Sequence, residues 1–385
     1  MIVLSASRLY TPLEELQNAL LFLEDGRISA ISSRGSAAIP NHARLVDLGD
    51  SILAPAFLDL HMHGGAGLDV MRASRDELPR LGQWLATHGV AGYFATTVAA
   101  PLDSTCAALE RLANLIEGKT AGDEAIAARP LGIHLEGPFL SHKRRGVHPP
   151  QYLVEPTLPV FERLWQAARG HVSMMTIAPE IPRALEVIAE AARRKVCVSI
   201  GHSDAVLAAA RAGVKAGARH ATHTFNAMRP LDHRDPGILG EVLTNTRLTA
   251  DIIADGIHVA PEVVRLFLQA KGSDNAVLIT DAISAAGMPD GTYQLGPIQV
   301  EVKDGKCTAN GTLAGSVLTM DRAVRNVTQF AGWSLRDAVR AASLNPARAA
   351  GLGGHGRLEA GAQANIVVLS PSGQVRQTIV RGHGC

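Results

Sequence analysis

Eight short apolar segments recur along the middle of the chain, and most are separated by stretches in which apolar residues follow helical spacing. The segments are APAFLDLHMHG, GYFATTV, LGIHLEGP, VSMMTIAPE, VCVSIGHSD, HATHTFNAM, LTADIIADGIH and AVLITDAIS. Strands that alternate with helices pair in parallel, and eight such units in about 300 residues predict an α/β fold of the (β/α)8 TIM-like barrel type. A doubly wound open sheet is the structural alternative.

The helical stretches carry boundary signals. They read TCAALERLANLIEG, ALEVIAEAARRK, SDAVLAAARAGVKAG and PEVVRLFLQAK. Ser203 is placed to be an N-cap and Pro261 to be a first-turn residue. After the eighth segment we predict an inserted β-hairpin that turns at Asp304-Gly305, and SLRDAVRAASLNPARAAGL then predicts a last helix.

Both ends of the chain read as short strands around turns. Asp25-Gly26 is a hairpin signal within NALLFLEDGRISAISSRG, and ANIVVLSPSGQVRQTIVRGHG has the same character. Because two such small groups of strands are unstable alone, we expect them to combine. The sequence therefore predicts a small β-sandwich domain formed by residues 1–53 and 356–385, with the barrel at 54–355.

Composition excludes several classes of function. Lys and Arg number 37 against 36 Asp and Glu in 385 residues, so no basic field is available to bind nucleic acid. The first residues lack a signal-peptide pattern, and no apolar run is long enough to span a bilayer. The four cysteines form no CxxC pair and are interpreted as packing residues. We expect a cytoplasmic protein with neither a nucleic-acid partner nor a membrane partner.

Histidines and carboxylates gather where the predicted strands end, which in a barrel is the edge that carries the active site. His61 and His63 are two residues apart on one strand, so both point to the same side. Burying several imidazoles and carboxylates together is costly unless a cation compensates. The sequence therefore predicts a divalent-metal site among His61, His63, Glu136, His202, His223 and Asp281. We interpret His134 and His220 as structural histidines.

The chain also resembles a known family through a set of motifs that covers nearly its whole length. These motifs are DGRI, PAFLDLHMHG, HLEGPFL, GHSDA, THTFNAM, DGIHV, ITDAISAAG, GTLAGS and NPARAAGL. They resemble the amidohydrolase superfamily, and within it the N-acetylglucosamine-6-phosphate deacetylases. The resemblance implies an enzyme that hydrolyses N-acetylglucosamine 6-phosphate to glucosamine 6-phosphate and acetate.

The same resemblance implies roles for the polar residues. Glu136, His202 and His223 would hold the main metal, and His61 and His63 would contribute to a second site. One or two divalent ions per subunit are expected, with zinc favoured over iron, manganese or cobalt. Asp281 would be the general base and then the general acid for a metal-activated water. MMTIAPE contains no lysine that could bridge two metals, so dihydroorotase-like and hydantoinase-like readings lose ground.

Residues that would contact the amino-sugar phosphate also follow from the resemblance. Arg234 would reach a neighbouring subunit's site, which implies a homodimer, whereas Lys143, Arg144 and Arg145 are interpreted as a solvated charge run. The other substrate-binding candidates are Val147, His148, Asn226, Ala227, Asp255, His258, Leu313, Ala314 and Gly315. Two alternatives stay open. One is an amidohydrolase for another N-acyl substrate, such as N-acetylgalactosamine 6-phosphate or an N-acyl amino acid, and the other is a non-catalytic phosphosugar-binding protein.

Overall fold

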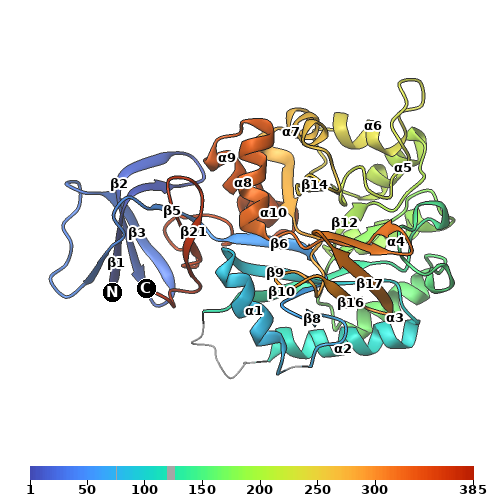
Figure 1. The fold of residues 1–385 in the computed structure, drawn as a ribbon, viewed down its shortest axis with the longest axis horizontal. Coiled ribbons are helices and arrows are strands. Elements are labelled where there is room, and N and C mark those ends of the chain that lie inside the picture. The colour runs from blue at the N-terminus through green and yellow to red at the C-terminus, as the bar shows by residue number, and fades with distance from the viewer. Residues whose placement is uncertain (75, 119–125) are drawn as a thin grey trace.

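The computed structural model describes residues 1–74, 76–118 and 126–385, and a closed barrel forms its centre (Figure 1). Within these residues, eight parallel strands surround the barrel in chain order: β6 (Phe57–Met62), β9 (Val90–Thr97), β10 (Arg129–Glu136), β11 (Val172–Ile177), β12 (Cys197–Ile200), β13 (His220–Ala221), β14 (Ala250–Ile253) and β15 (Ala276–Ile279). The amide of Ala221 joins β13 to β14 through the carbonyl of Thr249, and a parallel bridge from Met62 to Ala282 joins the first strand to the last. The ring is therefore closed, and the open-sheet alternative is wrong.

Helices cover the outside of the barrel and share its apolar core. The described residues form α1 (Leu78–Thr87), α2 (Leu102–Glu117), α3 (Leu158–Ala167), α4 (Ala184–Arg193), α5 (Leu207–Ala216), α6 (Gly237–Thr244), α7 (Pro261–Asn275), α8 (Met320–Ala331), α9 (Leu335–Ala342) and α10 (Leu344–Ala349), with short 3-10 turns η1 (His142–Arg144) and η2 (Pro150–Tyr152). The four predicted helical stretches are α2, α4, α5 and α7. Pro261 opens α7 as expected.

Two local predictions are wrong. Ser203 does not cap a helix, because α5 begins only at Leu207 and the Ser203 hydroxyl instead donates to Glu180. The last predicted helix is divided into α9 and α10. Ser343, between them, has non-helical backbone angles (φ −134°, ψ −73°), and Pro346 has no N–H to continue the ladder back to Ala342.

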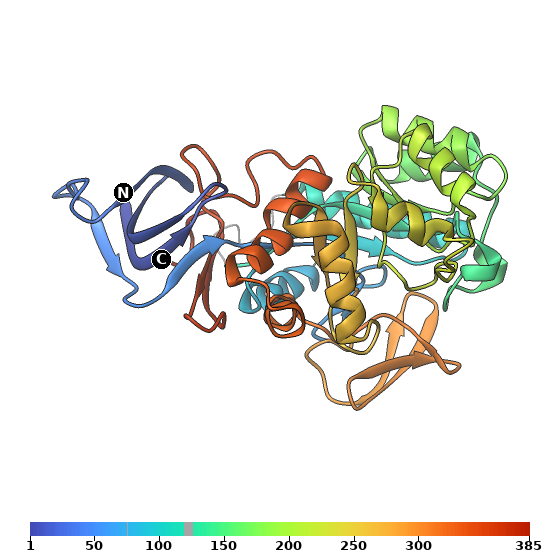
Figure 2. The same ribbon diagram turned by 90° about the horizontal axis from the view of Figure 1, so that it is seen from above.

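The predicted hairpin is part of a four-stranded antiparallel insertion beside the barrel. It contains β16 (Gly291–Leu295), β17 (Ile298–Lys303), β18 (Lys306–Ala309) and β19 (Thr312–Leu313), with the expected turn at Asp304-Gly305. Figure 2 shows the insertion standing apart from the helical layer. One of its faces is apolar and packs through Val300 and Val302 against a cluster that includes Val98. This packing fixes the insertion next to the barrel mouth.

Both ends of the chain meet in one seven-stranded sheet at the opposite side of the molecule (Figure 1). Its strands are β1 (Ile2–Tyr10), β2 (Glu15–Glu24), β3 (Arg27–Ser33), β4 (Arg44–Asp47), β5 (Ile52–Pro55), β20 (Ile366–Leu369) and β21 (Val375–Ile379). The antiparallel pair β5–β20 joins the N-terminal and C-terminal parts, and Asp25-Gly26 forms the predicted turn. Side chains from both parts, such as Leu21 and Ile366, enter one apolar core, so the sheet folds over itself as a sandwich.

None of the helices in the described residue ranges combines the length and apolar character needed to cross a membrane. All four cysteines lie in these ranges as free thiols, and Cys197 and Cys307 are buried.

Candidate active site

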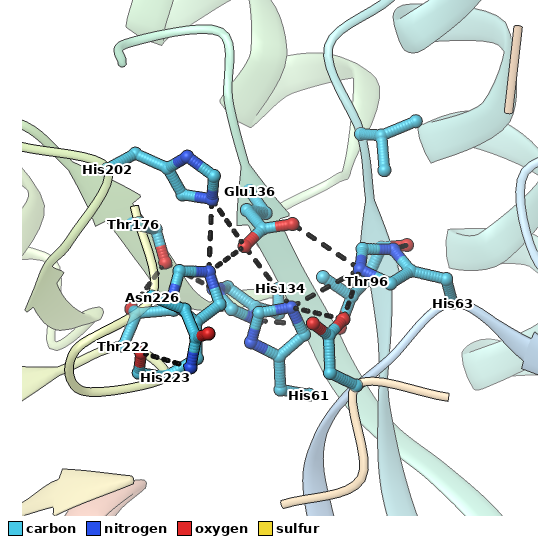
Figure 3. A network of polar contacts seen from close by, with 12 residues as sticks. His61, His63, Thr96, His134, Glu136, Thr176, His202, Thr222, His223 and Asn226 are labelled. Carbon is cyan, nitrogen blue, oxygen red and sulfur yellow. Dashed lines mark hydrogen bonds and ion pairs between the residues drawn. The ribbon is translucent and has the colours of Figure 1, made fainter. Parts of the chain in front are cut away.

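Six polar side chains meet at the carboxyl edge of the barrel. His61 belongs to β6, His63 directly follows that strand, and Glu136 is the last residue of β10. His202, His223 and Asp281 each lie two residues beyond the end of their strand. Figure 3 shows the four imidazole rings turned toward the carboxylate of Glu136. The structure therefore brings together all six residues of the predicted metal site.

Glu136 lies between two pairs of imidazoles. Its Oε1 is 3.2 Å from Nε2 of His202 and 3.0 Å from Nε2 of His223, and its Oε2 is 3.3 Å from Nε2 of His63. Asp281 approaches from the other side, with Oδ1 3.0 Å from Nε2 of His63 and 3.5 Å from Nε2 of His61. The two carboxylates thus enclose the space onto which all four Nε2 atoms converge.

The geometry of the imidazoles suits metal ligation. Nε2 of His202 and Nε2 of His223 are 3.0 Å apart, and those of His61 and His63 are 3.3 Å apart. Nδ1 of His202 faces the carbonyl oxygen of Arg144 at 3.0 Å, and Nδ1 of His63 faces that of Thr96 at 3.1 Å. A carbonyl can only accept, so Nδ1 carries the proton and Nε2 presents a lone pair to a cation.

His148 has the opposite arrangement, although it too lies near Glu136. Its Nδ1 accepts the backbone N–H of Ala99 at 3.1 Å. In the neutral ring the proton therefore resides on Nε2, which is 3.6 Å from Oε2 of Glu136. His148 is a hydrogen-bond donor pointing into the site, and a ligand role for it would require the other tautomer.

The charges of the site also favour a cation. Burial opposes a positive charge on His63, but hydrogen bonds to Asp281 and Glu136 outweigh burial and raise its pKa to about 10. Burial also opposes a positive charge on His223, but the hydrogen bond to Glu136 and the charge of that carboxylate outweigh burial and raise the pKa of His223 to about 9. Because both carboxylates stabilise positive charge in this buried space, the residues fit a divalent ion, and the histidine and carboxylate donors suit zinc, iron, manganese or cobalt.

Three of these residues adopt an unusual backbone conformation. His202, His223 and Asp281 have φ values of 47°, 28° and 50°, which is the left-handed region that non-glycine residues rarely occupy. Such strain persists only where surrounding contacts hold it in place, and it clusters at functional sites. The carboxyl edge therefore holds its polar side chains at a conformational cost.

Buried groups around the ligands supply those contacts. Asp59, fully buried, accepts the backbone N–H of His61 at 3.3 Å. Asp251 on β14 accepts the backbone N–H of His223 through one oxygen and lies 2.9 Å from Nε2 of His220 through the other. No sequence pattern indicates Asp251, and the interpretation of His220 as structural agrees with this contact.

A cavity of about 410 Å³ opens above the converging side chains. Its lining contains most of the predicted ligands and substrate residues: His63, Glu136, Val147, His148, His202, His223, Asn226, Ala227, His258, Asp281, Leu313 and Gly315. Val98, Gly146, Leu295 and Thr312 also line it and were not predicted. Thr312 belongs to the GTLAGS motif, which could have identified it, whereas Val98 follows β9 and Leu295 lies on the insertion outside any of the motifs.

Four predicted residues do not line this cavity. His61 lies beneath it, fully buried, and Ala314 is buried in the apolar cluster of the insertion. Asp255 acts on a lining residue, because its Oδ2 lies 2.7 Å from Nδ1 of His258. Arg234 sits in an exposed loop away from the cavity, where its backbone N–H donates to Asp232. Arg234 therefore does not line the cavity of the chain that carries it.

The charge run at residues 143–145 is only partly solvated. Lys143 and Arg144 line the cavity. Arg144 also donates from Nε to Oδ1 of Asp204 at 2.9 Å, while its carbonyl accepts from His202. The prediction of a purely solvated run is wrong for Arg144, because the loop that carries it folds over a metal-ligand candidate 58 residues further along the chain.

Comparison with known proteins places this geometry in a family. Residues 52–384 match the model of the amidohydrolase family. N-acetylglucosamine-6-phosphate deacetylase of Lysinibacillus sphaericus is 38% identical over 94% of this chain and 92% of its own length. N-acetylgalactosamine-6-phosphate deacetylase of Escherichia coli O157:H7 is also 38% identical, over 99% of this chain and 98% of its own.

A solved structure matches the whole fold. It is a mutant of N-acetyl-D-glucosamine-6-phosphate deacetylase from Mycobacterium smegmatis in complex with N-acetyl-D-glucosamine-6-phosphate. Its TM-score is 0.92 at 36% identity, with 99% of this chain and 98% of that chain covered.

Proposed function

This chain belongs to the amidohydrolase family, and on that premise we propose that it hydrolyses N-acetylglucosamine 6-phosphate to glucosamine 6-phosphate and acetate. The observation that carries the proposal is the convergence of four imidazoles and two carboxylates at the base of one cavity. Relatives at 38% identity over nearly the whole chain are deacetylases of amino-sugar phosphates, which supports the substrate class.

The proposed metal ligands divide into two groups. Glu136, His202 and His223 would hold one divalent ion, and His61 and His63 would contribute to a second, with zinc favoured. Such an ion, when bound, polarises an amide carbonyl and lowers the pKa of water from about 15.7 to about 7.

Asp281 is proposed to move the proton. Burial opposes its charged form, but His61 and His63 outweigh burial and lower its pKa, so it is a carboxylate at neutral pH. A carboxylate in this position can accept a proton from the attacking water and return it to the amine nitrogen as the C–N bond breaks. The Nε2–H of His148 points into the same space and can donate to the carbonyl oxygen of the substrate.

The sugar phosphate would lie against the polar groups of the cavity. Asn226, Ala227 and His258 line the cavity, and the contact with Asp255 orients the His258 ring. Arg234 is exposed and away from its own cavity, which supports the proposal that it reaches the site of a second subunit in a homodimer. The four free thiols are compatible with the cytoplasm, which is the compartment that we propose.

The direct experiment measures acetate release by metal-replete protein from N-acetylglucosamine 6-phosphate and from unphosphorylated N-acetylglucosamine. We expect a strong preference for the phosphate. Equal turnover of the two sugars would contradict the phosphate-binding roles, and no release from either would contradict the proposed activity.

Hybrid dimers test the role of Arg234. Arg234→Ala alone should lose activity, and so should Asp281→Asn alone. When the two variants are unfolded together and reassembled, a hybrid pairs an intact Asp281 with an intact Arg234 from the other subunit, so activity should return. Inactive hybrids would show that Arg234 does not act across a subunit boundary.

N-acetylgalactosamine 6-phosphate is a second candidate substrate, because the N-acetylgalactosamine-6-phosphate deacetylase is as similar to this chain as the N-acetylglucosamine-6-phosphate deacetylase, at 38% identity each. Competition between the two epimers in one reaction decides between them. Faster consumption of the galactosamine derivative would replace the proposed substrate but leave the reaction unchanged.

A further inference from the structure

Beside the proposed active site lies a second cavity. Its volume is about 710 Å³, and it runs between loop 145–150 and the insertion of β16–β19. The two cavities share part of their lining, namely Gly146, Val147, His148 and Thr312. On the insertion, Leu295 lines the first cavity while Pro297 and Ile298 line the second. The second cavity is therefore a continuation of the first, and we name it the side groove.

The position of the insertion keeps the side groove next to the reacting centre. The backbone N–H of Gly296 donates to Oδ2 of Asp69 at 2.6 Å. Gly296 also packs so closely on Val98 that an added Cβ would lie 2.5 Å from the Val98 side chain. Only glycine fits here, so the turn between β16 and β17 is held against the barrel.

Part of the lining of the active-site cavity is apolar. Val98 and Leu295 are almost fully buried and belong to the apolar cluster of the insertion, against which Val147 packs. The polar residues Asn226 and His258 belong to the same active-site cavity. An N-acyl sugar phosphate has one apolar part, its acyl chain, and a polar remainder. The acyl chain therefore matches this apolar part of the lining, and His148, the proposed donor to the acyl carbonyl oxygen, lines both cavities.

The lining of the side groove is mixed. It includes the apolar residues Val147, Pro149 and Ile298 beside polar residues such as Arg145, Thr308 and Asn310. Gln299 and Glu301, which alternate along β17 with the buried Val300 and Val302, also line it. An aliphatic chain of a few carbons would contact the apolar residues of this lining.

From this geometry we infer a further activity, which rests on the proposed function: the protein also hydrolyses amides of glucosamine 6-phosphate whose straight acyl chain is longer than acetyl, such as propionyl and butyryl. Water supplies the oxygen that bonds to the carbonyl carbon, the C–N bond breaks, and a proton from water moves to the amine nitrogen. The products are a short-chain carboxylate and glucosamine 6-phosphate, and no other reactant is needed.

The test compares kcat/KM for the N-acetyl, N-propionyl and N-butyryl derivatives of glucosamine 6-phosphate with metal-replete protein, measured as amine release. A closed acyl pocket discriminates against each extra methylene by roughly 10–200-fold. We expect the butyryl value to lie within about tenfold of the acetyl value. A loss beyond about 100-fold with normal acetyl turnover would overturn this inference alone, whereas inactivity with all three would overturn the proposed function as well.

A matched pair of variants tests whether the acyl chain lies in the side groove. Gln299→Trp fills the side groove, and Lys303→Trp puts the same bulk on the same strand face, beyond the residues that line the groove. We expect Gln299→Trp to lower kcat/KM for the butyryl substrate by more than about tenfold while acetyl turnover stays unchanged, and Lys303→Trp to change neither.

Two results of this comparison would overturn the inference. One is an equal effect of Gln299→Trp on acetyl and butyryl substrates, which would mean that the variant damages the site as a whole. The other is a selective effect on a C1 benzyl glycoside of N-acetylglucosamine 6-phosphate with butyryl turnover unaffected, which would assign the side groove to the reducing end of the sugar.

Discussion

The terminal sheet and the carboxyl edge of the barrel are both buried, but the sheet buries aliphatic side chains and the barrel edge buries imidazoles and carboxylates. The sheet packs aliphatic side chains such as Leu4, Leu21 and Ile366, all with no exposed surface. The barrel edge buries His61 completely and Glu136 to 3% exposure, beside residues with left-handed backbone. Burial of apolar area stabilises the first region, whereas desolvation and strain cost free energy in the second. Stability and chemistry therefore reside in different parts of the chain.

The largest effect that separates the two regions should come from Asp281→Asn. Loss of a general acid and base typically costs about 100- to 10,000-fold in rate, and we expect kcat to fall by this amount while substrate still binds. Because the change removes one buried charge, the melting temperature should stay close to that of the unchanged protein. Rate measurements check the fall in kcat, and calorimetric titration checks that the substrate still binds.

Asp321→Asn is the matched control for that experiment. Asp321 is a partly buried aspartate that contacts His88 and Arg325 away from the site, so its loss should affect stability and leave kcat unchanged. Turnover at the original rate in Asp281→Asn would overturn the proposed role of Asp281, whereas substrate binding without acetate release by the unchanged protein would support a phosphosugar-binding protein without catalysis.

Leu21→Ala should show the converse pattern in the terminal sheet. Removing most of a fully buried leucine leaves a cavity, and we expect the free energy of unfolding to fall by about 3 kcal/mol. The folded protein should keep its kcat, because Leu21 packs in a different cluster from the barrel core. Urea unfolding and turnover at low temperature measure both quantities, and a parallel loss of kcat would show that the sheet supports the site directly.

Asp251→Asn tests whether contacts around the barrel edge hold the metal ligands. His223 has no hydrogen-bond partner for Nδ1 among the described residues, so Asp251 at its backbone N–H is the contact that fixes it. Loss of such a supporting contact typically weakens metal affinity by about 10- to 100-fold, which competition with a chelator measures. Glu241→Gln, a buried carboxylate that contacts Arg211 and Asn245, is the control. Equal affinities in the two variants would contradict the role of Asp251.

The smallest effect concerns a buried charge that belongs to neither region. Lys271 donates to the carbonyls of Val242 and Asn245 at the end of α6, and burial lowers its pKa to about 8. Between pH 8 and about 10.5 the unfolded chain holds this proton more tightly than the folded chain does, so this group makes stability rise with pH. Lys271→Met should remove that rise in unfolding experiments across this window, and an unchanged slope would contradict the assignment.

Local sequence patterns were sufficient for much of the architecture. Apolar segments that alternate with helical stretches predicted the eight barrel strands, and Asp25-Gly26 and Asp304-Gly305 marked turns that the structure contains. The HxH spacing placed His61 and His63 on one strand end. These features were predictable because strand alternation, turn chemistry and helical periodicity depend on residues within a few positions of one another.

Tertiary structure decided the features that depend on partners far apart in the chain. The Ser203 hydroxyl donates to Glu180 and does not cap a helix. The carbonyl of Arg144 accepts from His202, so Arg144 is not simply part of a solvated charge run. The proton on His148 is placed by the amide of Ala99, 49 residues earlier, and His223 is held by Asp251, 28 residues later. The side groove exists only where the insertion meets loop 145–150. The sequence by itself determined which residues reach the barrel edge, whereas proton positions, supporting contacts and cavity shape were decided by packing, because each depends on atoms that only the folded chain brings together.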